Sequence, residues 1–323
     1  MADGGLRLTR REFYPVAALA VGAACSRKPR LPLSPPGNSA VFVAKAASYA
    51  AELERPIEEG LRACGLDVRG KNVLLKPNLV EFDASTSINT HTAVIAAAFA
   101  VFTKVGAATV RIAEGPGHRR DTLFLAEQAG YRHGIAQWEK LFIDLNRDDV
   151  SAVRGFAGRG EFFFPNAALD ADLIVSLAKM KTHHWAGATL SMKNFFGLVP
   201  GAVYGWPKNI LHHIGIANSI VALNKTFRKT FAIVDGIVGM EGNGPIQGTP
   251  KQSGVLIMGA DLPAVDATCC RIMGIDPLQL EYMRLAAELG HIEESRIEQR
   301  GENALSVRAP FTLIKEFQHV RLA

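Results

Sequence analysis

One stretch of this 323-residue chain, Lys179 to Gly201, interleaves basic and aromatic residues in a way that suits a binding pocket. Lys181, His183 and Lys193 lie around Trp185, with several glycines and alanines between them. Small residues let a backbone approach a ligand closely. A lysine held among aromatic rings has a depressed pKa, and a histidine titrates near neutrality, so the two types together suit anion binding and proton transfer. The alternative is a lysine-rich solvated loop, which would not need the aromatic residues.

Polar motifs also follow other apolar runs that we predict to be strands. Lys76-Pro77-Asn78 closes the run 72–76, and Glu114 to His118 follows the run 109–113. The stretch that begins at Lys179 follows the apolar run 173–177. Strands that alternate with helices predict an α/β fold, with a mostly parallel sheet or sheets and helices on both faces, in one large domain or two sub-domains. Ligands of such folds bind at the carboxyl ends of the strands, where these three motifs would meet.

A glycine-dense segment, 235–245, follows another predicted strand at 230–234 and carries two carboxylates. Asp235 and Glu241 could bind a hard cation such as Mg²⁺. They could instead pair with Lys179 or Lys181. Both alternatives stay open at this stage.

The start of the chain resembles an export signal. Arg10-Arg11 precedes the uncharged apolar run 14–24, a pattern that resembles a twin-arginine signal. We therefore expect residues 1–24 to be a signal peptide that the twin-arginine export machinery recognises. Residues 25–40 are rich in proline and would form a tether. Two alternatives stay open: Cys25 is a lipid anchor and the sole membrane contact, or the chain is cleaved near Ala24 without a lipid. The protein would then lie in the periplasm or on the extracellular face of a membrane. The remainder divides into an N-terminal α/β part with the pocket loops, 41–205, and a C-terminal α/β part, 206–323.

Composition narrows the classes of function. The chain is 48% apolar and 21% charged, as a globular protein is, and its formal net charge is +5. Such a mild excess suits an anionic small molecule and is too small for a nucleic-acid partner. The four cysteines form no CxxC pair, so we expect neither a thiolate zinc site nor an iron–sulfur cluster.

The order of these motifs resembles the family called domain of unknown function 362 (DUF362). The resemblance rests on Lys76-Pro77-Asn78-Leu79-Val80, on the stretch 179–201 and on the segment 235–245, and it covers nearly all of residues 41–290. Many members of that family are joined to 4Fe–4S ferredoxin modules, whose cluster cysteines this chain does not contain.

A weaker resemblance is to the lactate racemase family, which holds a nickel-pincer nucleotide. It rests on the segment 113–119 and on His183-x-x-Ala186-Gly187 followed by Lys193. That resemblance implies that His118 and His183 form an acid–base pair and that Lys193 anchors the cofactor. It also implies that His212 or His213 binds the metal, so a nickel-pincer-type nucleotide or a divalent metal is the cofactor to consider. The other residues that we predict to contact a ligand or cofactor are Lys76, Asn78, Lys179, Lys181, Asn194, Asp235 and Glu241.

Our first hypothesis is an exported enzyme of the DUF362 type that binds an anionic ligand or cofactor. It would transfer a proton or hydride at carbon, as a racemase, an epimerase or a redox enzyme does. One alternative is a non-catalytic anion- or metal-binding protein at the membrane surface, and another is an accessory protein that matures a cofactor. Because His183 and His184 are adjacent, we expect one of them to face the pocket and the other to face away.

Overall fold

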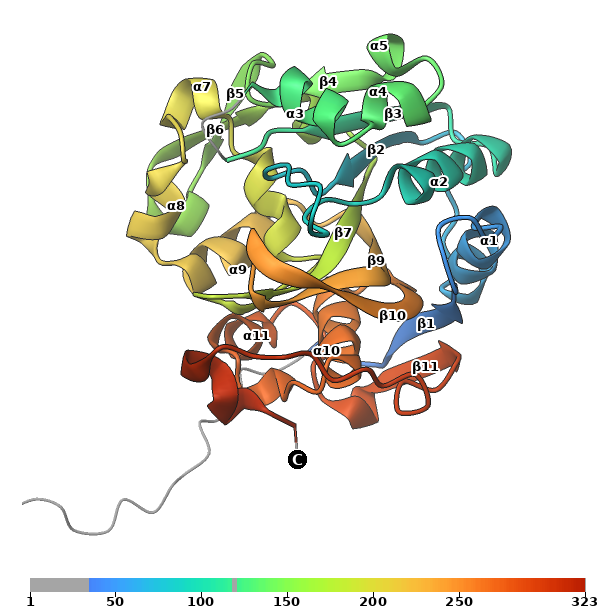
Figure 1. Cartoon of the computed structure of the whole chain (residues 1–323). Helices are drawn as coiled ribbons and strands as arrows, with labels where there is room; N and C mark the ends of the chain where they lie inside the picture. Colours follow the sequence, from blue (N-terminus) through green and yellow to red (C-terminus); the bar gives the residue numbers. More distant parts are fainter. Residues whose placement is uncertain (1–34, 118–120, 323) are drawn as a thin grey trace, which may run out of the picture. The chain divides into compact units, whose positions relative to one another are not determined.

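A single mixed sheet organises the chain in the computed structural model, which describes residues 35–117 and 121–322 (Figure 1). Eight of its strands lie side by side, and a ninth short strand, β8 (Gly187–Thr189), pairs with β7. From one edge to the other the eight are β11 (Ile297–Gly301), β1 (Ser39–Lys45), β10 (Gln247–Gly259), β9 (Thr230–Asn243), β7 (Leu173–His183), β2 (Asn72–Pro77), β3 (Thr109–Glu114) and β4 (Phe142–Asp144). Strands from both sides of residue 205 therefore contribute to the same sheet.

The middle of the sheet is parallel. Strands β9, β7, β2, β3 and β4 all run in the same direction, whereas β10 is antiparallel to both of its neighbours. The predicted α/β class with a mostly parallel sheet is confirmed by this topology. Since parallel strands share an orientation, the ends of β2, β3 and β7 bring their polar motifs to one edge of the sheet.

Helices cover the sheet and complete the core. The longer ones are α1 (Glu54–Ala63), α2 (Thr92–Lys104), α9 (Ile216–Thr226) and α10 (Leu262–Ile272). The shorter ones are α3 (Thr122–Gln128), α4 (Tyr131–Gly134), α5 (Trp138–Leu141), α6 (Asn166–Leu169), α7 (Gly201–Tyr204), α8 (Asn209–Ile214) and α11 (Glu281–Ala286). The described residues also form a hairpin of β5 (Val150–Arg154) and β6 (Glu161–Pro165) and the 3-10 turns η1 (Phe156–Gly158), η2 (Lys193–Leu198), η3 (Pro277–Gln279), η4 (Glu294–Arg296) and η5 (Lys315–Val320).

The main core forms because successive side chains of a strand point to opposite faces of the sheet. Val73, Leu75, Val175 and Leu177 point from the sheet toward α1 and α2 and pack in one apolar cluster with buried residues of both helices. Residues of opposite parity, such as Ser176, face the other side, where η2 and α9 lie. Across residues 35–117 and 121–322, no helix is long and apolar enough to cross a membrane.

Two strands run further than the sequence predicted. We expected strands to end at Leu177 and Val234, but β7 continues to His183 and β9 to Asn243. The reason is that the charges following those positions neutralise each other inside the sheet. Lys179 and Asp235 are neighbours in the register of β7 and β9 and form an ion pair of 2.9 Å with both side chains buried. Charges that indicate a loop in isolation are thus compatible with a buried strand when they are paired.

Candidate functional site

A cavity of about 480 Å³ opens where the ends of β2, β3 and β7 meet. Its walls come from six segments of the chain, and we call it the Lys193 cavity. Its polar and charged lining residues include Asn78, Glu114, Lys181, His183, His184, Thr189, Lys193, Asn194, Lys208 and His212. Its apolar lining includes Leu79, Val80, Pro116, Trp185, Phe196, Leu211, Ile216 and Ile246. This size and this mixture are typical of small-molecule sites.

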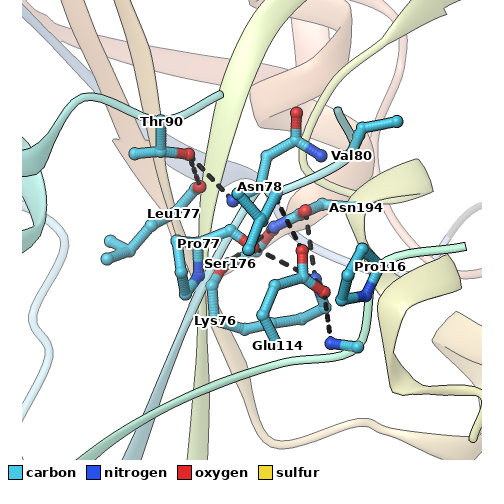
Figure 2. Close-up of polar contacts among 12 residues, drawn as sticks. Lys76, Pro77, Asn78, Val80, Thr90, Glu114, Pro116, Ser176, Leu177 and Asn194 are labelled. Carbon is cyan, nitrogen blue, oxygen red and sulfur yellow. Dashed lines mark hydrogen bonds and ion pairs between the residues drawn. The ribbon is translucent and has the colours of Figure 1, made fainter. Parts of the chain in front are cut away.

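The floor of the cavity rests on a buried ion pair, Lys76 with Glu114, whose Nζ and Oε1 lie 2.7 Å apart (Figure 2). Lys76 Nζ also donates to Asn194 Oδ1 at 3.2 Å. The two Glu114 oxygens accept further hydrogen bonds from the backbone N–H groups of Leu79 and Gly115. Glu114 is thus fully engaged and offers the cavity no free negative charge.

Gly197 makes this packing feasible. A Cβ at this position would lie 1.9 Å from Glu114 Oε1 and 2.6 Å from Lys76 Nζ. The last turn of η2 can therefore lie directly against the ion pair, and the first turn carries Lys193 and Asn194 in the cavity wall.

Lys181 is a second buried lysine, and no carboxylate binds it among the described residues. Its Nζ donates to Asn78 Oδ1 at 2.7 Å and to the Ile88 carbonyl at 2.9 Å. Burial holds its pKa well below the usual range, and the charge of Lys193 adds to that effect. The Lys181 side chain is therefore a fixed polar contact in the wall, stabilised in its neutral form.

Lys193 has the least satisfied amino group of the site. Its Nζ lies 4.6 Å from the centre of the Phe196 ring and has no hydrogen-bond or ion-pair partner within the described part of the chain. Burial lowers the pKa of Lys193 to about 8, so most of this lysine is charged at neutral pH. Nearby, Thr189 Oγ1 is buried and has no hydrogen-bond partner among the described residues either.

His183 closes β7, and its tautomer is set by the hairpin that follows. The loop 184–186 connects β7 to β8, and Gly187 adopts the left-handed backbone, with φ of 78°, that such loops require. The N–H groups of Trp185 and Ala186 donate to His183 Nδ1 at 3.0 and 3.1 Å. A neutral ring must then carry its proton on Nε2, and burial with the charge of Lys193 holds the His183 pKa well below the usual range. His183 is consequently a hydrogen-bond donor toward the cavity.

His184 has the opposite arrangement. Its Nδ1 lies 2.8 Å from the Gly244 carbonyl and donates to it, which leaves Nε2 with a lone pair. The two imidazoles are stacked with centroids 4.9 Å apart, and both line the cavity. Our expectation that only one of them would face the pocket was wrong, because the strand ends at His183 and the tight loop turns His184 back to the same side.

Other predicted residues are distributed unevenly around the cavity. Asn78, Lys181, Asn194, Lys193, His183 and His212 line it. His212 also contacts the edge of Trp185, at 5.4 Å between ring centres. His118 lies outside the described residues, so its place relative to the cavity is not described.

The remaining five predicted residues do not line the cavity. Lys76 lies behind Glu114, and Lys179 is held by Asp235 and by the Tyr49 hydroxyl at 2.7 Å. Glu241 accepts a hydrogen bond from Thr312 N and lies 3.7 Å from Lys251. His213 is exposed on α8, because consecutive helical residues point about 100° apart.

The described residues do not assemble a metal site. No group of three or more His, Cys, Asp or Glu side chains converges on a position for a metal ion in residues 35–117 and 121–322. The donor set of the Lys193 cavity is dominated by lysines and by histidines whose ring nitrogens are partly engaged by backbone groups. We therefore derive no chemical step through a metal.

Sequence reasoning missed three residues that shape the site. Thr189 and Lys208 line the cavity, and the buried Asp266 binds the backbone N–H groups of Ser191 and Met192, directly before Lys193. Nothing in the sequence indicated that Asp266 would reach η2.

Comparison with known proteins identifies the family. The model of the domain of unknown function DUF362 matches residues 73–271, which is more than half of the chain. The chain belongs to the DUF362 family. The matched region contains the cavity residues from Asn78 to Ile246 and ends beyond Asp266. A curated relative, the thylakoid-associated protein sll1697 of Synechocystis sp., is 29% identical over 76% of each chain.

Two solved structures are similar to this DUF362 chain over part of their length. The lactate racemase apoprotein of Thermoanaerobacterium thermosaccharolyticum has a TM-score of 0.47 at 13% identity. The match covers 74% of this chain and 57% of that one. A Thermotoga maritima protein has a TM-score of 0.39 at 16% identity, with 70% of this chain and 59% of that one covered. This chain thus spans well under two thirds of both solved proteins.

Proposed function

We propose that this protein binds an anionic organic molecule in the Lys193 cavity and transfers a proton at one of its carbon atoms. The observation that carries the binding half is that Lys193 Nζ and Thr189 Oγ1, both of residues that line the cavity, have no hydrogen-bond partner among the described residues. A buried hydroxyl without a partner costs about 1–3 kcal/mol, which an oxygen atom of a ligand would recover.

The charges of the cavity support an anion. Lys193, which is mostly charged at neutral pH, lines it, and the carboxylate of Glu114 is already bound by Lys76. A carboxylate or phosphate placed beside Lys193 would form a charge-assisted hydrogen bond. The apolar walls around Leu211 and Ile216 would enclose the rest of an organic ligand.

The two stacked imidazoles support proton transfer. His183 offers an N–H donor at Nε2, and His184 offers a lone pair at Nε2. His184 would accept a proton from a carbon or hydroxyl group of the ligand, while His183 would donate a hydrogen bond to the developing oxyanion. A non-catalytic anion-binding protein remains the alternative, since binding needs Lys193 but not the lone pair of His184.

Exchange of a carbon-bound hydrogen of the ligand for solvent deuterium distinguishes the enzyme from the non-catalytic binding protein. The protein would be titrated with a panel of 2-hydroxy and 2-oxo acids by calorimetry, and the same acids would be followed by NMR in D₂O. We expect Lys193→Met to abolish binding and exchange, and His184→Gln to abolish exchange while binding survives. The exposed Lys140→Met serves as the matched control. Binding without exchange for any acid would leave the binding protein, and unchanged binding in Lys193→Met would refute the site.

We also propose that the protein is exported and held at a membrane surface. Its support is the twin-arginine pattern and Cys25, which lie outside the described residues. The Synechocystis relative is named for its association with thylakoids. Cell fractionation tests this: Arg10→Lys with Arg11→Lys should retain the protein in the cytoplasm, and Cys25→Ser should release it from the membrane fraction. An unchanged distribution in both variants would refute the proposal.

A further inference from the structure

Lys208 is a buried cavity residue that the proposed function does not use. Its side chain is 2% exposed and lines the Lys193 cavity beside Gly115. Its Nζ donates one hydrogen bond, to the Gly115 carbonyl, and no carboxylate pairs with it within residues 35–117 and 121–322. An ammonium group carries three donors and needs a counter-charge when it is buried. These surroundings favour the neutral amine.

The backbone of Lys208 is also unusual. It has φ of 63° and ψ of 46°, a left-handed conformation that residues other than glycine seldom adopt. This conformation turns the chain into α8 and places the side chain beneath the loop after β3, where a Cβ on Gly117 would lie 3.9 Å from Lys208 Cδ. Non-glycine residues kept in this conformation gather at functional sites.

The charged groups around Lys208 leave its amine reactive. Glu114, Lys76 and Asp144 all act on it. Glu114 is held by Lys76, and Asp144 accepts a hydrogen bond from Thr122 Oγ1 at 2.9 Å. Burial dominates over the attraction of the two carboxylates and lowers the pKa of Lys208 to about 7. About half of this lysine is therefore a free amine at neutral pH, against roughly one part in a few thousand for an exposed lysine.

We propose that Lys208 captures the carbonyl group of an anionic aldehyde or ketone as a Schiff base. This inference rests on the proposed function, because Lys193 would bind the anionic group of the same molecule. During the attack one N–H of the amine donates to the Gly115 carbonyl while the nitrogen lone pair bonds to the carbonyl carbon of the ligand, and this hydrogen bond is lost when the amine gives up its hydrogens. The carbinolamine that forms then loses water, whose oxygen comes from the carbonyl and whose two hydrogens come from the amine. The product is an imine, and no oxidant or reductant is needed.

Reductive trapping tests this directly on the intact protein. The protein would be treated at pH 7 with cyanoborohydride and either glyoxylate, an anionic aldehyde, or acetaldehyde, a neutral one. Peptide mass spectrometry would then give the rate of modification at each lysine, with the exposed Lys140 and Lys229 as internal references. We expect Lys208 to react at least about 100-fold faster than either reference, given its roughly thousandfold larger neutral fraction. In Lys193→Met, reaction with glyoxylate should fall about tenfold, whereas reaction with acetaldehyde should not change.

The outcomes separate this inference from the function on which it rests. Suppose that glyoxylate binding depends on Lys193 but Lys208 reacts no faster than Lys140. That result would overturn the Schiff-base inference and leave the proposed function standing. Suppose instead that Lys208 reacts fast and that Lys193→Met does not slow its reaction with glyoxylate. That result would overturn the anion site and support the amine chemistry of Lys208. Lys208→Arg should abolish trapping at residue 208, and its thermal unfolding would confirm that the fold is retained.

Discussion

Ser191 Oγ donates a hydrogen bond of 2.5 Å to Asp266 Oδ1, two residues before Lys193. Asp266 also accepts the backbone N–H groups of Ser191 and Met192, at 2.8 and 3.2 Å. A side chain of α10 thereby fixes the segment that carries Lys193 into the cavity. Asp266 is a positioning residue for the anion site, since it does not line the cavity itself.

We predict that the buried Asp266 carboxyl makes the stability of the protein depend on pH. Burial raises its pKa from 3.8 to about 7, so between these values the folded protein binds more protons than the unfolded chain. Its contribution to the free energy of unfolding therefore falls as pH rises from about 4 to about 7 and is constant above. Urea unfolding should show wild type losing stability relative to Asp266→Asn across this window. A difference between wild type and Asp266→Asn that stays flat across this window would contradict the assignment.

Glu114→Gln should destabilise the protein strongly. The change leaves the Lys76 ammonium buried without its counter-charge, which costs about 3–5 kcal/mol in comparable sites. Glu302→Gln breaks a surface pair with Lys45 of similar length, 2.8 Å, and should cost at most about 1 kcal/mol. Chemical denaturation of both variants provides the comparison. Equal and small effects would mean that the Lys76–Glu114 pair does not hold the floor of the cavity.

Gly197→Ala should be poorly tolerated for a steric reason. The added methyl group would overlap Glu114 Oε1 and Lys76 Nζ, so η2 must move away from the ion pair. Overpacking of this kind costs about 1–3 kcal/mol, and here it should also weaken anion binding. Gly160→Ala is the matched control, because no atom of the described residues, other than its chain neighbours, lies within 4 Å of its Cβ position. Thermal unfolding and calorimetry on the two variants would decide, and wild-type behaviour of Gly197→Ala would show that the contact is not tight.

His183 should remain neutral at a pH where a free imidazole, with a pKa near 6.5, is charged. Burial and the charge of Lys193 both depress its pKa. Nitrogen-15 NMR between pH 5 and 8 should show Nδ1 unprotonated and Nε2 protonated throughout. In Lys193→Met the His183 pKa should rise, since one of its two leading causes is removed. A proton on Nδ1 in the folded protein would contradict the donor role that we assign to this residue.

The general architecture of the site could be predicted from sequence, because it depends on local patterns. Apolar runs that alternate with helical segments indicated parallel strands, and the motifs at Asn78, Glu114 and Lys193 do meet where those strands end. The family resemblance used the same motifs, and the DUF362 match confirms it.

Which residues line the cavity could not be predicted in full, because contacts between segments far apart in the sequence decide which side chains are available to a ligand. The sequence left open whether Asp235 binds a cation or pairs with Lys179, and the register of two neighbouring strands decides for the ion pair. Lys208 gave no signal, since its burial results from the chain returning over the loop after β3. Thr189 looks like an ordinary strand residue in the sequence, and only the structure shows that its hydroxyl is buried with no hydrogen-bond partner among the described residues.

A crystal structure with 4-bromobenzoate would test the central claim most directly, because the anomalous signal of bromine fixes the orientation of the ligand. We predict that the carboxylate lies within hydrogen-bond distance of Lys193 Nζ and Thr189 Oγ1, with the ring against Leu211 and Ile216. A ligand bound elsewhere, or bound in the cavity with its carboxylate directed away from Lys193, would contradict the anion site.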